Sequence, residues 1–353
     1  MAVNLFDTRT MMGMITEGEK ATKSFFRDRY FKNRPTFNTT KIDFDVVGLK
    51  DRKLAPFVHP KAGGVAVDRQ SFRAESYEAP AISLMRVTTA EDMLKRSPGE
   101  TIYNGKTPQQ RAAEILGRDL SDLDDMITRR EEVMCREALL EGKVTVKGEG
   151  YDEVIDFWPT ADKPTTALAT KWTADAADAV SIMADLRTIR RAMVKKAGFT
   201  PHEIICGTAV IDCLVSKLGK DKALDMRRVD MGQIDPKMLP NGLTYWGYLK
   251  DSALDIYSYD DWFVNDEGNE VPMMPEDKIL MASPNARTTL AYGIVPLVVD
   301  EKGDNAVAFA EGARVPNSWV QRAAPAGRVV QLNSRPLPIV NQVYGFHVIT
   351  GAV

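Results

Sequence analysis

Residues 107–142 read TPQQRAAEILGRDLSDLDDMITRREEVMCREALLEG, and they carry the clearest periodic pattern in the chain. Thr107, Pro108 and Gln110 stand where a capping box places a hydroxyl, a first-turn proline and a third-position glutamine. Apolar side chains then recur at helical spacing, at Leu116, Leu120, Leu123, Ile127, Met134 and Ala138. Gly142 is the residue type that favours a helix end. We predict one amphipathic helix over residues 107–141, about 50 Å long, which is longer than one small core can cover.

This helix has an acidic face. Between Glu114 and Glu132 it holds seven acidic residues against three arginines. Upstream, between Lys50 and Arg73, six basic residues stand against two acidic ones. Each pattern is also typical of a solvated charged surface, but together they predict complementary surfaces between copies of the chain. The candidate inter-subunit contact residues are Lys50, Arg52, Lys53, Lys61, Arg69, Arg73, Asp119, Asp122, Asp125 and Glu132.

The basic residues belong to a segment that does not resemble part of a compact domain, DRKLAPFVHPKAGGVAVDRQSFRAESYEAP (51–80). Its arms are typical of extended chain, two glycines interrupt it, and no apolar alternation is long enough to bury both sides. The residues before it, KIDFDVV (41–47), alternate apolar and charged side chains and predict a strand. We expect a long hairpin whose partner surface lies outside its own core.

The rest of the first half predicts short elements. Residues 1–40 indicate an arm with a short helix near residues 20–30, whose aromatic cluster needs another element to pack against. Residues 143–157, KVTVKGEGYDEVIDF, predict two strands joined by a turn at residues 147–150.

The second half predicts a mixture of helices and strands. A second amphipathic helix, with Ile182, Leu186, Ile189 and Met193 on one face, ends at Gly198. Strands and short helices then alternate, which favours a central α+β domain around a mostly antiparallel sheet. Residues 327–350 predict returning strands, with a kinked crossing between them at Pro336 and Pro338.

The composition is that of an ordinary globular protein. The chain has 353 residues, of which 44% are hydrophobic and 27% charged, and this length favours two or three domains. A formal net charge of −3 argues against a dedicated nucleic-acid-binding protein. Three cysteines without CxxC spacing and three distant histidines predict neither a disulfide framework nor a zinc site. The apolar run MMGMI (11–15) is too short for a secretory signal or a membrane span, so we expect a cytoplasmic chain.

Two short motifs invite a ligand-binding interpretation. NGKT (104–107) ends like a phosphate-binding loop, but Glu100 stands where that motif requires its first glycine, so helix capping is favoured. DDWFVNDEGNE (260–270) lacks the ligand spacing of a calcium loop and predicts a polar hairpin turn at residues 266–269. No nucleophile signature lies near any histidine. We therefore predict no catalytic residue, no cofactor and no metal.

Several segments, taken in order, resemble the lambda-type major capsid protein family of tailed phages, the major capsid protein E family. They are RKLAPFVHPKAGG (52–64), RSPGE (96–100), TPQQRAAEIL (107–116), ALLEGKVTVKGEGY (138–151), DEGNEVPMMPEDKILMAS (266–283), ARTTLAYG (286–293) and NSRPLPI (333–339). Each segment alone is a weak signal, but their order and spacing are specific, and the resemblance runs from about residue 40 to the end.

The resemblance implies an α+β Hong Kong 97-type capsid fold. Its parts would be an N-terminal arm and first strand (1–44), an extended E-loop (45–80), a peripheral domain (81–199) with a spine helix (107–141), an axial domain (200–310) and C-terminal strands (311–353). In such shells the E-loop lies over the peripheral domain of a neighbouring subunit. The family offers no catalytic residues to transfer, and the lysine–asparagine cross-link of some relatives is not expected in this branch.

The resemblance also implies a function. The chain would be a structural subunit that self-assembles as hexamers and pentamers into the icosahedral head of a tailed phage, enclosing DNA without sequence-specific binding. Expected partners are other copies, a scaffolding protein, a portal and a decoration protein, with no membrane. Assembly is expected in the host cytoplasm, and the final location is the virion. The alternatives are a cellular nanocompartment shell of the same fold and, more distantly, a phosphate-binding enzyme.

Overall fold

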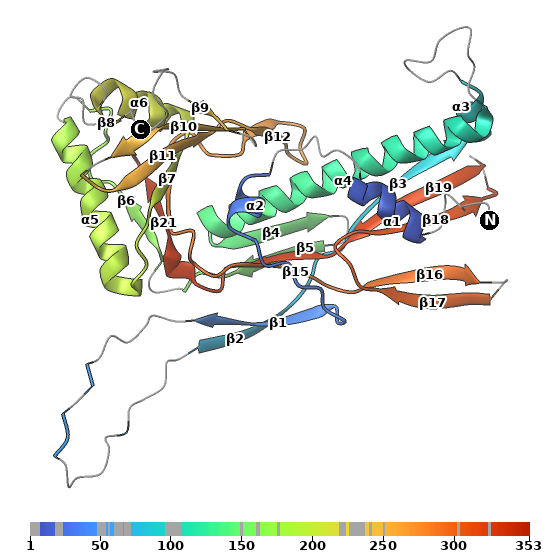
Figure 1. The fold of residues 1–353 in the computed structure, drawn as a ribbon, viewed down its shortest axis with the longest axis horizontal. Coiled ribbons are helices and arrows are strands. Elements are labelled where there is room, and N and C mark those ends of the chain that lie inside the picture. Colours follow the sequence, from blue (N-terminus) through green and yellow to red (C-terminus); the bar gives the residue numbers. More distant parts are fainter. Residues whose placement is uncertain are drawn as a thin grey trace.

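Figure 1 shows the computed structural model of the chain, in which the long helix α4 (Pro108–Leu140) extends from the right side of the view to its centre. The structure describes residues 8–17, 24–47, 54–55, 57–59, 66, 72–95, 107–148, 151–159, 163–174, 177–218, 224–225, 237–239, 242–249, 251–301, 304–323 and 326–353. Statements below refer to these residues.

Helix α4 confirms the predicted helix and its start. The Gln110 N–H donates to Thr107 Oγ1 at 3.3 Å, and the Thr107 N–H donates to Gln110 Oε1 at 3.0 Å, which completes the capping box. The apolar face is buried in two places. Its first half, including Leu116 and Ile127, forms a cluster with a three-stranded sheet. Its second half, from Val133 to Leu140, joins another buried cluster, which we name the main core and which also contains Phe26, Ile205 and Phe346. Two separate layers therefore cover a helix that one layer could not.

The layer beside the first half of α4 is an antiparallel sheet in the order β18-β19-β3. Its strands are β3 (Ile82–Thr89), β18 (Val315–Gln321) and β19 (Gly327–Ser334). Val330 and Leu332 of β19 face the helix, and helix α1 (Thr8–Glu17) adds Met11 and Ile15 to the same cluster. The five-residue helix α3 (Ala90–Leu94) continues β3 and leads toward α4.

The second layer is an eight-stranded sheet in the upper left of Figure 1. Its order is β6-β21-β14-β7-β11-β10-β8, with β9 also paired to β10, and all its pairings are antiparallel except β7–β11 and β6–β21. The predicted mostly antiparallel sheet is thus confirmed. The strands are β6 (Thr165–Ala167), β7 (Glu203–Cys206), β8 (Leu224–Asp225), β9 (Lys237–Met238), β10 (Leu243–Leu249), β11 (Leu254–Tyr259), β14 (Ile279–Ala282) and β21 (Phe346–Thr350).

Both faces of this sheet are buried. Successive side chains along a strand point to opposite faces, so neighbouring residues pack against different elements. Ile204 and Cys206 pack with helices α5 (Ala179–Ala197) and α6 (Thr208–Leu218), whereas Ile205 faces the main core beside α4. Helix α5 ends at Gly198, which has a φ of +78° as the sequence predicts for a helix-ending glycine. Strands β6 and β21 lie outside residues 200–310, so the predicted axial range does not hold the whole sheet by itself; the domain boundaries stay a prediction.

The remaining strands form two-stranded pairs. The predicted strand KIDFDVV is β1 (Lys41–Val47), paired with β2 (Phe72–Glu78), and its Ile42 and Phe44 are buried between exposed aspartates. The predicted hairpins at residues 143–157 and 260–270 are confirmed as β4–β5 and β12–β13. The strands are β4 (Lys143–Gly148), β5 (Tyr151–Asp156), β12 (Trp262–Val264), β13 (Glu270–Pro272), β15 (Thr289–Tyr292), β16 (Val295–Glu301), β17 (Asp304–Ala310) and β20 (Pro336–Ile339).

Two sequence expectations differ from the structure. Pro336 and Pro338 do not form a kinked crossing: both lie inside β20, which pairs only with β15 among the described strands, so its other edge tolerates residues without an N–H. The short helix expected over residues 20–30 is a single turn, α2 (Phe26–Arg29). The aromatic cluster around it is buried as expected, with Phe26 and Phe31 at the main core.

Position 142 requires glycine, both because of its backbone conformation and because Trp158 lies next to it. This leads to a stability prediction. Its φ is +67°, and a Cβ atom there would lie 2.0 Å from the indole ring of Trp158. Gly142→Ala is therefore expected to lower the free energy of unfolding by at least about 2 kcal/mol, from backbone strain and overpacking together. Urea unfolding of the unassembled subunit measures this loss. Gly148→Ala is the control, because no atom lies within 4 Å of a Cβ there; equal losses for both would contradict the prediction.

Candidate assembly surfaces

The β1–β2 hairpin presents apolar side chains that no described residue covers. Leu54 and Phe57, which follow β1, are 93% and 106% exposed. Large apolar side chains exposed this fully indicate a surface for another molecule. Of the predicted basic contact residues, Arg73 lies in β2, and only its backbone is described. The others lie outside the described residues: Lys50, Arg52, Lys53, Lys61 and Arg69.

The exposed acidic residues of α4 are partly neutralised by their own chain. Nη1 of Arg86, on β3, donates to Asp119 Oδ1 at 2.7 Å and to Asp122 Oδ2 at 2.9 Å. Asp125 lies half-buried on the same helix. These three aspartates remain accessible in part, but two of them already hold a cation, which weakens their attraction for basic residues of a neighbour.

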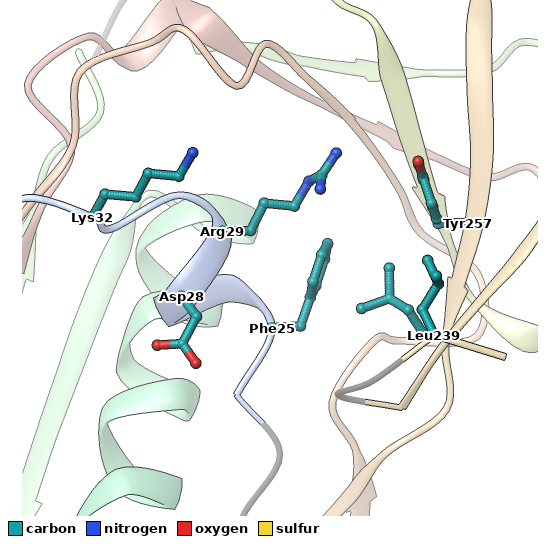
Figure 2. A pocket seen from close by; sticks show the side chains of 7 residues that line it. Phe25, Asp28, Arg29, Lys32, Leu239 and Tyr257 are labelled. Carbon is teal, nitrogen blue, oxygen red and sulfur yellow. The ribbon is translucent and has the colours of Figure 1, made fainter.

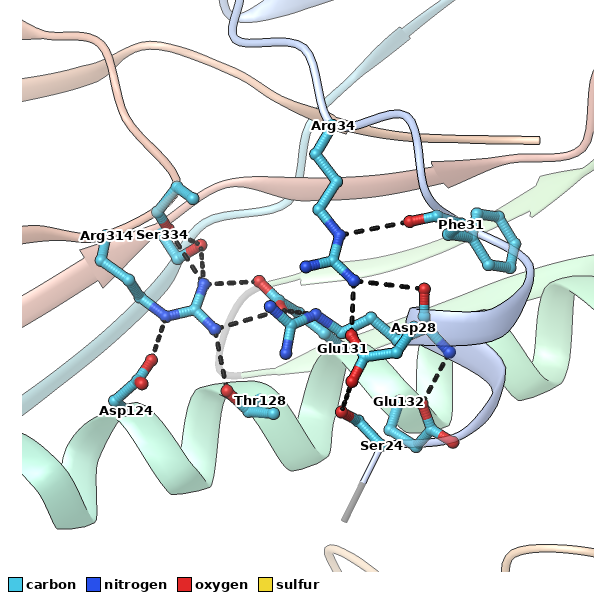
Figure 3. A network of polar contacts seen from close by, with 12 residues as sticks. Ser24, Asp28, Phe31, Arg34, Asp124, Thr128, Glu131, Glu132, Arg314 and Ser334 are labelled. Atoms are coloured by element: carbon cyan, nitrogen blue, oxygen red, sulfur yellow. Dashed lines mark hydrogen bonds and ion pairs between the residues drawn. The ribbon is translucent and has the colours of Figure 1, made fainter. Parts of the chain in front are cut away.

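A buried ionic cluster fixes the inner side of α4 (Figure 3). Arg314, just before β18, donates through Nε to Asp124 Oδ1 at 2.5 Å and through Nη1 to Glu131 Oε1 at 2.6 Å. Its Nη2 donates to Thr128 Oγ1 at 3.1 Å. Arg27 supplies a second cation, with its Nε 3.1 Å from Glu131 Oε2. Two arginines therefore balance two carboxylates, and buried charges are stable in a protein only when paired in this way.

Glu132 is wrong as an inter-subunit contact, because its side chain is 0% exposed within its own chain. Its two carboxylate oxygens accept the backbone N–H groups of Phe25, Phe26 and Arg27 at 2.7 to 2.9 Å. These N–H groups begin helix α2 and have no acceptor inside that helix. Tyr259 donates its hydroxyl to Glu132 Oε1 at 3.2 Å. Glu132 thus caps α2 from another helix, and burial raises its pKa to about 7 although the N–H groups act to lower it.

Residues 24–37, which we name the N-terminal strap, connect α4 to the other layers. Arg29 forms an ion pair with Glu203 of β7, and the Tyr30 hydroxyl donates to Glu203 Oε1 at 2.6 Å. Farther along, the N–H of Phe37 donates to the carbonyl oxygen of Tyr292 in β15 at 2.8 Å. The strap therefore contacts α4, the eight-stranded sheet and β15, and it holds the three in one arrangement.

A pocket of about 300 Å³ lies between the strap and the eight-stranded sheet (Figure 2). Arg29 and Lys32 at this pocket are the residue types that attract an anion. The Arg29 guanidinium, however, is paired with Glu203 and lies 5.5 Å from the ring centre of Tyr257. Because this cation is already neutralised by its own chain, the pocket does not indicate a ligand site.

Sequence reasoning missed the residues that hold the acidic helix in place. Arg314 and Glu131 are separated by 183 positions, and no spacing rule links them. Leu54 and Phe57 did carry a signal, because they are large apolar residues in a segment without core periodicity. In the part of the chain that the structure describes, no group of acidic, histidine or cysteine side chains is arranged to hold a metal ion, and no helix is long and apolar enough to cross a membrane.

Comparison with known proteins places this architecture in a family. The profile of the family described as phage major capsid protein E matches residues 7–346. The major capsid protein of Escherichia phage lambda is 25% identical over 328 residues, covering 90% of this chain and 89% of that protein. The major capsid protein of Enterobacteria phage P21 is 22% identical over 352 residues, covering 96% of each.

Solved structures agree on the fold. A capsid protein of a prophage of Escherichia coli CFT073 superposes with a TM-score of 0.69 at 19% identity, covering 99% of each chain. A phage-related protein of Bordetella bronchiseptica RB50 superposes with a TM-score of 0.53 at 9% identity, again covering 99% of each chain. The predicted Hong Kong 97-type fold is confirmed. With its profile match spanning the hairpin, α4 and both sheets, the chain belongs to the phage major capsid protein E family.

Proposed function

We propose that the chain is the repeating subunit of an icosahedral phage head, which forms hexamers and pentamers and encloses the DNA genome of a tailed phage. The family match over residues 7–346 carries this proposal. A structural role is what membership of a capsid protein family implies. The alternatives of a cellular nanocompartment and of a phosphate-binding enzyme have no comparable support, and Thr107 of the NGKT motif serves as a helix cap.

The shape and charge of the chain support assembly around DNA. The β1–β2 hairpin exposes apolar side chains, as a subunit that reaches over a neighbour requires. A net charge of −3 lets a shell enclose DNA without binding it tightly, because strong binding depends on many basic contacts to phosphate. Each contact between copies can be weak, since every copy in a closed shell has several neighbours and the contacts act together.

The proposed partners follow from this role. They are other copies of the chain, a scaffolding protein that guides assembly, a portal and a decoration protein. We place assembly in the host cytoplasm and the finished shell in the virion. Negative-stain electron microscopy of the purified chain tests the central claim: closed shells are expected, and a chain that stays monomeric with or without its scaffolding protein would refute it.

The basic residues of the predicted E-loop lead to an assembly prediction. The triple variant Arg52→Glu, Lys53→Glu and Arg69→Glu is expected to lower particle yield at least about tenfold, because like charges placed across an interface cost several kcal/mol. The urea unfolding midpoint of the subunit is expected to stay unchanged. Particles are counted by sedimentation and microscopy.

A matched control makes the same change of charge elsewhere. Lys171, Arg191 and Lys195 are exposed residues on and before α5. Their triple replacement by glutamate is expected to leave the particle yield much less affected. Normal yield from the first triple variant would remove the electrostatic part of the proposal, and equal losses from both would show that only the total charge matters.

A further inference from the structure

A groove of about 780 Å³ lies between the N-terminal strap, β1 and the loop before β15, and we name it the strap groove. Half-buried Pro35, Phe37 and Pro284 line it with apolar surface, and the buried Phe44 and Ile339 complete this lining. Its volume lies in the range of pockets that hold drug-sized molecules. The strap groove is therefore large enough to receive several side chains of another molecule.

The two walls of the strap groove carry opposite charge. Lys32 of the strap and Arg287 of the loop before β15 are exposed, and neither forms an ion pair in the part of the chain that the structure describes. The opposite wall is β1, which presents the exposed Asp43 and Asp45. A partner that fits this groove has an apolar centre, an acidic side toward the strap and a basic side toward β1.

The β12–β13 hairpin has such an apolar centre. Trp262 and Val264 are 52% and 62% exposed on one face of β12, and Glu270 is the partner of Val264 across the hairpin. Phe263 points to the other face, where its ring centre lies 5.7 Å from the guanidinium carbon of Arg136 on α4. Phe263 thus anchors the hairpin, and the two exposed apolar side chains form a surface for another molecule.

The charges around the hairpin match both walls of the strap groove. Residues 260–270 contain five acidic residues and no lysine or arginine. Glu267 and Glu270 are exposed and form no ion pair among the described contacts. Beneath the hairpin, α4 contributes the exposed Arg129, next in sequence to the Arg130 that pairs with Asp266 of the turn. Acidic and basic groups thus lie on the two sides that the groove requires.

The hairpin is ordered before any partner binds. Asn265 Oδ1 accepts the N–H groups of Glu267 at 3.1 Å and Asn269 at 2.8 Å, which closes the turn. At the base, the Met273 N–H donates to the Asp261 carbonyl oxygen at 2.7 Å. A surface that is already ordered loses little entropy on binding.

The hairpin and the strap groove lie on opposite sides of one copy. In Figure 1, β12 lies above α4, whereas β1 and β15 lie below it, so a single copy does not bring the two surfaces together. Two different surfaces of one chain that fit each other join copies head to tail. Such contacts close into rings when the rotation between copies allows it.

We propose that the β12–β13 hairpin of one copy docks in the strap groove of a neighbouring copy. Trp262 and Val264 pack against the apolar lining, the exposed glutamates of the hairpin face Lys32 and Arg287, and Arg129 faces the aspartates of β1. This inference rests on the proposed assembly of the chain and names one contact within a ring. It involves no residue of the segment that follows β1.

Cross-linking of assembled particles tests this docking. The variant Asn33→Cys with Val264→Cys joins a residue of the groove to the hairpin, and a short bismaleimide is expected to convert it into a ladder of covalent multimers. Each single variant is expected to stay monomeric on the gel. All variants carry Cys213→Ser, because Cys213 is partly exposed, whereas Cys135 and Cys206 are buried.

The control pair is Val264→Cys with Met85→Cys. Met85 is 65% exposed on the three-stranded sheet, outside the strap groove, and this pair is expected to give monomers. Particles in which the Asn33 pair gives no multimers, or no more than the control pair, would overturn the docking.

A charge exchange provides a second test. Glu267→Lys with Glu270→Lys is expected to lower particle yield about tenfold, and adding Lys32→Glu with Arg287→Glu is expected to restore most of it. The urea unfolding midpoint of each variant shows that the subunit still folds. Wild-type yield from the lysine variant, or no recovery in the fourfold variant, counts against the docking.

A matched control places the same change of charge elsewhere. Glu91→Lys with Glu311→Lys alters two exposed acidic residues outside the hairpin and is expected to give nearly wild-type yield. The wild-type chain separates the two proposals. If it forms shells while the cross-link and the charge exchange fail, assembly stands and only this contact is wrong; if it forms none, both are wrong.

Discussion

Replacing Arg314 by alanine is expected to lower the free energy of unfolding by about 3–5 kcal/mol, the loss typical when one partner of a buried ion pair is removed. Arg314 is the one residue in Figure 3 that bonds to both Asp124 and Glu131. Without it, only Arg27 would face these two buried carboxylates, and one of them would remain uncompensated. Urea unfolding of the unassembled subunit measures the change. The dependence of the free energy of unfolding on urea concentration is expected to be the same for both proteins.

Arg86 offers a matched control for Arg314. It also joins β3 of the three-stranded sheet to two aspartates on α4, but its side chain is 39% exposed and the two carboxylates are nearer to water. Arg86→Ala is therefore expected to cost at most about 1 kcal/mol. If Arg314→Ala costs no more than Arg86→Ala, the buried cluster does not stabilise the joint between α4 and the strands around it.

Glu132→Gln is expected to remove a pH dependence from the stability of the subunit. The folded protein holds a proton on Glu132 up to a pKa of about 7, whereas a glutamate in the unfolded chain releases it near the ordinary pKa of 4.5. Between these values the folded state binds more protons, so the free energy of unfolding falls as the pH rises. A difference of this size corresponds to roughly 3 kcal/mol over the window.

The measurement is a series of urea unfolding curves between about pH 4.5 and pH 7.5. The wild-type chain is expected to lose roughly 3 kcal/mol more over this range than the Glu132→Gln variant, which cannot titrate at that position. Glu91→Gln, at an exposed carboxyl of α3, is the control and is expected to follow the wild type. Parallel pH profiles for the wild type and Glu132→Gln would show that Glu132 does not titrate in this window.

The N-terminal strap restrains how α4 can move relative to the eight-stranded sheet. Glu132 binds the first N–H groups of α2, and Glu203 binds Arg29 and Tyr30 a few residues later. The strap is thus fixed at two buried carboxylates, one on α4 and one on the eight-stranded sheet. Because it contacts both, any change in the angle between these layers must break or move at least one of the two contacts.

Local patterns predicted the local structure well. The capping box at Thr107 set the start of α4, and apolar spacing set its buried face, because both depend only on residues within a few turns. Alternation predicted β1 to the residue, and the glycine at position 268 marked the β12–β13 turn. The family resemblance, which rests on the order of many short segments, predicted the fold that the comparisons confirm.

Charge patterns predicted less, since they describe one side of each interaction. The acidic run on α4 indicated a surface for a neighbour, yet Glu131 and Glu132 are fully buried in their own chain. Their partners, Arg314 and the N–H groups of residues 25–27, lie more than 100 positions away in the sequence. A helix period shows which residues share a face, but it cannot show what that face meets.

The sequence by itself determined the helices, strands and turns whose signals are local, and through its resemblance it determined the family. Only the tertiary structure decided which charges are neutralised inside the chain and which stay exposed at its surface. The physical reason is that a carboxylate pairs with whatever cation the packing brings to it, and packing joins segments that no local rule connects. For this reason buried carboxylates of α4 pair with arginines of the same chain, whereas the β12–β13 hairpin has exposed acidic residues and an exposed tryptophan.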